Sequence, residues 1–432
     1  MHLIHDLMRR YLPFTLADKV VGQQDRIADE DAALAIPLRR RPPRKPAPAA
    51  SPLSISCPDP SAEDALRDHH LSTARDLARQ EDWKTLSAQI RQQDAARSLT
   101  PGGMPVAELM AYGARSDVVL AVEHALIDGK PSRGAPLLSG IEALEHVLAE
   151  HADDHVVAAI VAQTHGDLGW AWRGTGRTTQ VPARNREAFA AHFERANEIL
   201  LPFRDMAGAS ALVAGAACAL LGNEKDACRV VADRYEALID LNPANPRPMR
   251  ALGNHLLPRW FGSYDALELE ARRTAARTQG TWGAGGYTWV QFDAVAADTA
   301  ACARLDLAFF IEGLHDILAR SDDPHTINLL AAYCANATRH GGARDDRAVR
   351  NRKAIADCAE WIIREKLTEL HPMIWAHAAH GFDNNLHIRS APRFAASGRE
   401  DAMRIITALF SREIKAGKRI VFTDEGPVAQ PA

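Results

Sequence analysis

The sequence predicts an all-α protein in which antiparallel helical hairpins are stacked one after another. The first observation is a 3.6-residue hydrophobic period that runs from residue 61 to about residue 419. Leu137, Ile141, Leu144 and Leu148, for example, recur at i, i+4, i+7 and i+11, which places them on one helical face. The second observation is that only residues 419–423 show strand alternation. A helical body over residues 61–419 is therefore expected.

Helix start and stop signals divide this body into helices of ordinary length. Capping boxes are expected at Ser61 with Asp64 and at Ser397 with Glu400. Asp323 and Asn245 each precede a proline, which suits the first position of a helix. Gly417 suits a helix C-terminal end. Short turns between such helices favour antiparallel neighbours.

Proline content separates the N-terminal region from the body. Residues 1–36 are expected to be a short segment, partly helical or disordered, and residues 37–60 a basic, proline-rich linker. Eight prolines fall within residues 36–60, beside the cluster Arg39, Arg40, Arg41, Arg44 and Lys45. Residues 420–432 are expected to form a C-terminal tail, and the body is open to subdivision near residues 177–182.

Charge and cysteine usage narrow the functional classes. The 51 Lys and Arg against 55 Asp and Glu give a net charge of -4, so nucleic acid is not an expected partner. A nucleic-acid binder that uses residues 39–45 and 344–353 is the least favoured alternative. The six cysteines form no CxxC pair, which favours a reducing, cytoplasmic location. The longest apolar run, residues 209–221, is too short to cross a bilayer, so no membrane insertion is expected.

Residues 228–257 carry a family resemblance. Val231, Tyr235, Leu238 and Pro243 match the second-helix pattern of a tetratricopeptide repeat, and Leu252 with Gly253 is similar to the Leu-Gly pair of the next repeat. The resemblance implies a tetratricopeptide-like α-solenoid that acts as a scaffold for a protein or peptide partner, with no cofactor.

A histidine-rich segment, residues 371–387, is the strongest candidate for chemistry. If a helix begins at Pro372, His377 and His380 lie one turn apart and can offer two nitrogens to one metal ion, with Asp383 as a further ligand. The glutamate of an HExxH motif is missing. The alternative is that these imidazoles cap helix ends and pack beside Trp375.

Residues 166–177 are a candidate partner-binding surface. Trp170, Trp172, Arg173 and Arg177 stand among four glycines, and indoles with guanidinium groups suit an aromatic or anionic partner. The alternative is a loop whose two tryptophans are buried between helices. The glycine-rich residues 280–289 are expected to form an inter-helix loop.

A basic stripe is the last candidate. Arg344, Arg347 and Arg350 follow one another at i, i+3 and i+6, and of these Arg347 and Arg350 are taken as partner-binding residues. The alternative interpretation is that these arginines form a charged helix face exposed to solvent.

No motif in the sequence indicates a particular activity. The sequence has no GxSxG elbow, and no serine or cysteine has a partner identifiable by spacing. The leading hypothesis is a non-catalytic scaffold that mediates protein-protein interaction. The alternative is a metal-dependent enzyme centred on the histidine-rich segment.

Overall fold

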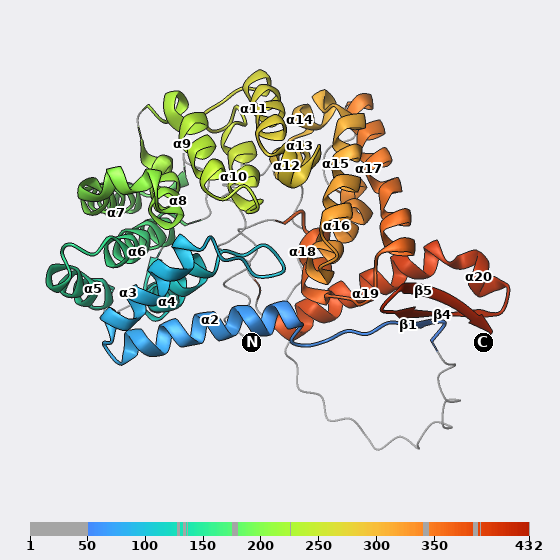
Figure 1. The fold of residues 1–432 in the computed structure, drawn as a ribbon, viewed down its shortest axis with the longest axis horizontal. Helices are drawn as coiled ribbons and strands as arrows, with labels where there is room; N and C mark the ends of the chain where they lie inside the picture. The colour runs from blue at the N-terminus through green and yellow to red at the C-terminus, as the bar shows by residue number, and fades with distance from the viewer. Residues whose placement is uncertain are drawn as a thin grey trace, which may run out of the picture.

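A computed structural model describes residues 51–127, 130–132, 135, 137–174, 180–224, 226–339, 345–382, 388 and 390–431. The protein is predominantly α-helical, and its helices follow one another around an arch whose first described helix, α2, extends toward α18 and α19 (Figure 1). Among the described helices, none combines the length and the apolar character that a bilayer crossing requires.

Seven α-helices are described in the first half of the arch. They are α2 (Ala62–Arg79), α3 (Trp83–Ala95), α4 (Val106–Ala125), α5 (Ser139–Glu150), α6 (His155–Arg173), α7 (Ala183–Leu200) and α8 (Ala211–Ala219). Alternate helices are in contact along one side of this half, since α2 packs on α4, α4 on α6 and α6 on α8. The 3-10 helices η2 (Leu201–Gly208) and η3 (Leu220–Asn223) flank α8, and a small hairpin, β2 (Leu126–Ile127) with β3 (Lys130–Pro131), follows α4.

The second half continues around the arch to the C-terminus. Its helices are α9 (Ala227–Leu241), α10 (Arg247–His255), α11 (Tyr264–Arg277), α12 (Gln279–Trp282), α13 (Gly285–Ala297), α14 (Thr299–Arg304), α15 (Leu307–Arg320), α16 (Pro324–Asn336), η4 (Ala337–Arg339), α17 (Asp346–Glu365), α18 (Pro372–Ala379), α19 (Ala391–Leu409) and α20 (Ser411–Lys415). The centre of this half is α13, which packs on α10, α11 and α15 and is buried on almost every side.

Most of the expected helix boundaries are present. The Ser61 hydroxyl accepts a hydrogen bond from the backbone N–H of Asp64, and the Asp323 carboxylate accepts one from Thr326. Gly417 follows α20 with φ +75°, a conformation that favours glycine. The capping box at Ser397 was wrong, because α19 begins at Ala391 with a proline in its first turn, and Ser397 lies inside that helix.

Two hydrophobic cores meet at α8. Leu212 and Ala216 belong to the core of α2 to α7, whereas Ala214 and Cys218 belong to the core of the second half. This division follows the helical period, because residues two apart on a short helix point to different sides. Helices α6 and α7, which flank residues 177–182, share the first core.

A three-stranded sheet joins the two ends of the described chain. The strand β4 (Lys418–Thr423) coincides with the alternation at residues 419–423, and it pairs antiparallel with β5 (Gly426–Pro431). The strand β1 (Leu53–Ser54) pairs parallel with β4, with Leu53 opposite Ile420. The last part of the range expected as linker, and the range expected as a tail, therefore both contribute strands to one sheet, and both lie beside α19 and α20 in Figure 1.

Candidate functional site

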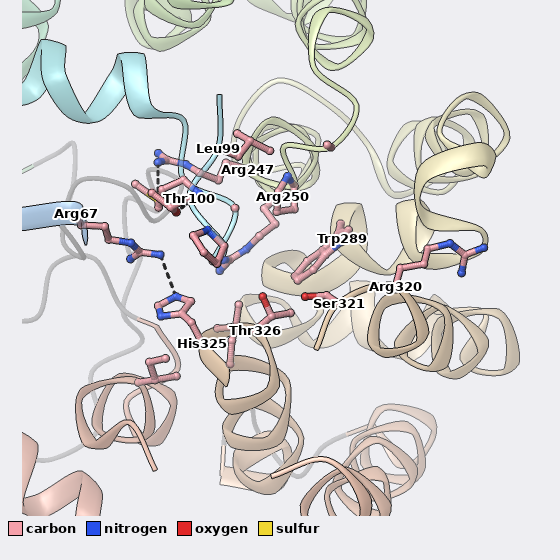
Figure 2. A pocket seen from close by; sticks show the side chains of 18 of the residues that line it. Arg67, Leu99, Thr100, Arg247, Arg250, Trp289, Arg320, Ser321, His325 and Thr326 are labelled. Carbon is pink, nitrogen blue, oxygen red and sulfur yellow. Dashed lines mark hydrogen bonds between the residues drawn. The ribbon is translucent and has the colours of Figure 1, made fainter. Parts of the chain in front are cut away.

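A cavity of about 270 Å³ lies between the two halves of the chain, since residues from both halves line it. Its wall is built by α2, the loop between α3 and α4, α10, α13, α16 and α18. We call it the central cavity. Figure 2 shows that side chains from these separate elements point toward one another across it.

Arg67 reaches the cavity from α2 and is held firmly in place. Its Nε donates to Oε1 of Glu63 over 2.5 Å, and both side chains are buried. Glu63 in turn accepts hydrogen bonds from the hydroxyl of Thr100 at 2.5 Å and from the backbone N–H of Gly102 at 3.0 Å. The carboxylate therefore anchors both the guanidinium and the loop between α3 and α4.

Arg250 contributes a second buried guanidinium from α10. It binds Asp293 of α13 with two parallel bonds, Nε to Oδ2 at 2.7 Å and Nη2 to Oδ1 at 2.8 Å. Its guanidinium carbon lies 4.8 Å from the ring centroid of Phe292. The bidentate pair and the aromatic face fix the direction of this side chain.

His325 links the two halves of the cavity wall. Nη2 of Arg67 lies 3.2 Å from Nε2 of His325, and because arginine only donates, the imidazole nitrogen accepts (Figure 2). Burial, followed by the charge of Arg67, holds the pKa of His325 well below its usual value of 6.5. The imidazole is therefore neutral at pH 7.

Two further arginines stand at the edge of the cavity and are less buried. Nη1 of Arg247 lies 3.7 Å from Oε2 of Glu108, and Nη1 of Arg320 lies 3.2 Å from Oδ1 of Asp316. In Figure 2 Arg320 points away from Arg67 and Arg250. Each of the four guanidiniums thus has a carboxylate of its own, so the wall presents N–H donors without a surplus of positive charge.

Apolar side chains form another part of the wall, namely Trp289, which is 2 % exposed, with Leu329, Ile374 and Phe382. Polar side chains share the lining with them, among them Thr100, Ser321, Thr326 and His377. The residues expected as an inter-helix loop, 280–289, instead form α12 and the first turns of α13. Gly286 allows α13 to pack closely on the C-terminal end of α11, because a Cβ there would come 2.3 Å from Oγ1 of Thr278.

The histidines of the metal hypothesis point in different directions. His377 is buried and lines the central cavity, whereas His380 is exposed and its Nδ1 bonds the carbonyl of Ala376. Both rings lie against Phe394, at centroid distances of 5.0 Å and 5.5 Å. Asp383 lies outside the described residues, and within the described ranges no three His, Cys, Asp or Glu side chains gather in an arrangement that could hold a metal ion.

The tryptophans of residues 166–177 belong to the first core. Helix α6 extends to Arg173, so this segment is helical rather than a glycine-rich loop as far as that residue. Trp172 is buried in the core, Trp170 packs edge-on against Phe193 at 5.7 Å, and Arg173 lies over the Trp170 ring. A Cβ at Gly169 would come 3.0 Å from the Phe193 ring, so the glycine serves helix packing. Arg177 lies outside the described residues.

The arginines of the basic stripe lie on the outer face of α17. Arg347 and Arg350 are exposed, as is Lys353 one turn further on, and we call these three residues the basic face. Arg344 lies outside the described residues. Arg352, in contrast, is buried and its Nη2 donates to Oγ1 of Thr299.

The buried cysteines are poor nucleophiles. Burial raises the pKa of the Cys218 thiol to about 12, and it raises the pKa of Cys334 well above the usual value. Because the thiolate is the reactive form, neither side chain is suited to nucleophilic chemistry at neutral pH.

Sequence reasoning missed the central cavity as a site. Arg67, Arg250 and His325 are far apart in the sequence and form no motif, so only the closure of the arch brings them together. One signal was present, since Arg250 lies in the stretch with the tetratricopeptide resemblance, and charged residues are unusual on the buried face of such a short helix.

Comparisons with protein-family models, with curated proteins and with solved structures find no match to this chain.

Proposed function

We propose that this chain is a non-catalytic, tetratricopeptide-like solenoid module that binds an acidic segment of a partner protein through the basic face of α17. The proposal depends on the ion pairing of the three cations of the basic face. Within the described part of the chain, Arg347, Arg350 and Lys353 make no ion pair with a carboxylate. Their positive charge is therefore directed to solvent or to a partner.

The geometry of α17 supports this assignment. The helix buries Ala348, Ile355 and Ile362 against the body, so its opposite face is held outward by the core. Of the two aspartates at its N-terminus, Asp345 accepts hydrogen bonds from the backbone N–H groups of Arg347 and Ala348 and is engaged as a cap, and Asp346 is exposed in the first turn. Residues three apart on a helix are neighbours, so the cations can engage a run of carboxylates together.

The arrangement of the helices supports the solenoid part of the proposal. The resembling segment is a pair of packed helices, α9 and α10, with Val231, Tyr235, Leu238 and Leu252 buried between them and their neighbours. The successive contacts of α2 with α4, α4 with α6 and α6 with α8 agree with stacked hairpins.

A native pull-down with crosslinking and mass spectrometry tests the proposal. The full chain is compared with Arg347→Glu/Arg350→Glu and with the charge-matched control Arg229→Glu/Arg412→Glu, whose arginines are also exposed but lie on α9 and α20. We expect one partner to be depleted by the first pair only and to be released as salt rises, because exposed charges are screened. Equal recovery with both pairs, or no crosslinked partner, would refute the proposal.

A further inference from the structure

The central cavity, which is separate from the basic face of α17, is lined by two buried arginines and by apolar side chains. We propose that it binds a small monocarboxylic acid with an apolar body, independently of any protein partner. The proposal rests on the two buried guanidiniums, on the balance of charge around them and on the apolar side chains that share the cavity lining.

The donors come from Arg67 and Arg250. Among the residues that the structure describes, Arg67 bonds Glu63 through Nε and His325 through Nη2, and Arg250 bonds Asp293 through Nε and Nη2. In each case the Nη1 amino group is left to donate to a ligand in the cavity. Both arginines are 7 % exposed and already fixed by their partners, so a ligand need not order them.

The charge balance selects the class of anion. Glu63 and Asp293 neutralise the two buried guanidiniums one to one, and the neutral His325 adds no charge. A phosphate dianion would have to leave water for a cavity with no surplus positive charge, which is costly. A carboxylate has only one charge and matches the planar N–H donors in shape, so it meets a smaller penalty.

The apolar wall accounts for the rest of the ligand. Trp289, Leu329, Ile374 and Phe382 line the cavity together with the arginines, so a ligand that is charged at one end and apolar at the other can satisfy both sides. A cavity of about 270 Å³ suits a compact ligand, since small-molecule sites begin at roughly 300 Å³.

Calorimetric titration of the full chain with three probes of similar shape tests whether the cavity prefers a single negative charge. Benzoate is the monocarboxylate, benzamide its neutral counterpart and phenyl phosphate the dianion. For benzoate we expect a dissociation constant of about 1 mM or lower, and for the other two binding at least about ten-fold weaker. No heat from benzoate up to about 10 mM, or equal binding of benzamide or phenyl phosphate, would overturn the proposal.

Two variants place the binding in the central cavity. Leu329→Trp fills the space without touching an ion pair, and Arg250→Lys keeps a cation beside Asp293 but removes the guanidinium donors. We expect both to weaken benzoate binding at least about ten-fold. Leu269→Trp is the matched control, because Leu269 is exposed on α11 outside the cavity.

The Leu329→Trp variant is decisive if Arg250→Lys does not fold, which circular dichroism reports. Benzoate affinity that is unchanged in folded Leu329→Trp protein, or lowered as much by Leu269→Trp, would show that benzoate binds elsewhere and would end the proposal. Because the basic face of α17 is not altered by these variants, the result is separate from the pull-down.

Discussion

Nη2 of Arg67, on the first described helix, donates to Nε2 of His325 on α16 over 3.2 Å. The contact spans the opening of the arch, and it lies on the wall of the central cavity (Figure 2). The pairing of β1 with β4 and the bond from the backbone N–H of Leu370 to the carbonyl of Ser56 join the same two ends of the chain. Hydrogen bonds therefore join the N-terminal part of the described chain to its later helices and to β4 at several places, one of them at the His325 imidazole.

Buried histidines should make the fold sensitive to acid. Burial lowers the pKa of His255 to about 4, whereas the unfolded side chain titrates near 6.5. As pH falls from 6.5 to 4 the unfolded chain takes up this proton first, so the free energy of unfolding decreases over that window and is constant above it. The loss from His255 alone is roughly 3 kcal/mol. His325 acts in the same direction.

Urea unfolding at several pH values measures this effect. His255→Phe keeps an aromatic ring beside Tyr235 and Phe261 but cannot take up a proton, so its stability should depend less steeply on pH. His124→Gln, at an exposed position of α4, should leave the dependence as in the unaltered protein. An identical slope for both variants would contradict the assignment to His255.

The Arg250–Asp293 pair should be costly to break from one side. Both side chains are less than a tenth exposed, so Arg250→Ala leaves a buried carboxylate without its partner. We expect a loss of about 3 to 5 kcal/mol in the free energy of unfolding. Arg250→Ala/Asp293→Ala should cost clearly less than the two single changes added together, which a double-mutant cycle by chemical denaturation measures. Simple additivity would show that the pair is not coupled.

Gly253 should be indispensable for the packing of α10 on α13. A Cβ at this position would lie 1.8 Å from the carbonyl oxygen of Val290, so Gly253→Ala forces the helices apart. We expect a loss of about 2 to 3 kcal/mol or more in thermal or chemical denaturation. Gly280→Ala is the matched control, because nothing lies within 4 Å of its Cβ position. That change in α12 should be neutral or stabilise by up to about 1 kcal/mol.

Leu53 should contribute to the stability of the body although it precedes the helical region. It is buried in the core of the second half, beside the strand β4. Leu53→Ala should lower the free energy of unfolding by about 2 to 4 kcal/mol, as large-to-small changes in cores do. Val428→Ala, on the exposed side of β5, should change it by less than about 0.5 kcal/mol. Equal effects of the two changes would mean that β1 does not anchor the sheet.

Local signals in the sequence predicted local structure well. The caps at Ser61 and Asp323, the helix end at Gly417 and the strand around residues 419–423 are all present, because each depends on the conformational preference of a few adjacent residues. The incorrect predictions at two glycines also came from the conformational preferences of adjacent residues. Gly286 was predicted to lie in a loop, and a loop was the alternative for Gly169, yet both lie in helices, where the missing side chain lets a neighbour approach.

The sequence by itself determined the helical class and the start of α2 after the cap Ser61, because helical periodicity and capping are local properties. The partner-binding role of Arg347 and Arg350 stays a prediction. The tertiary structure alone decided that His377 faces the central cavity while His380 is exposed, and that Arg67, Arg250 and His325 share one wall. Those relations depend on how helices distant in the sequence pack and on where the arch closes. No spacing along the chain encodes them, because burial and pairing of a charge are properties of the assembled core.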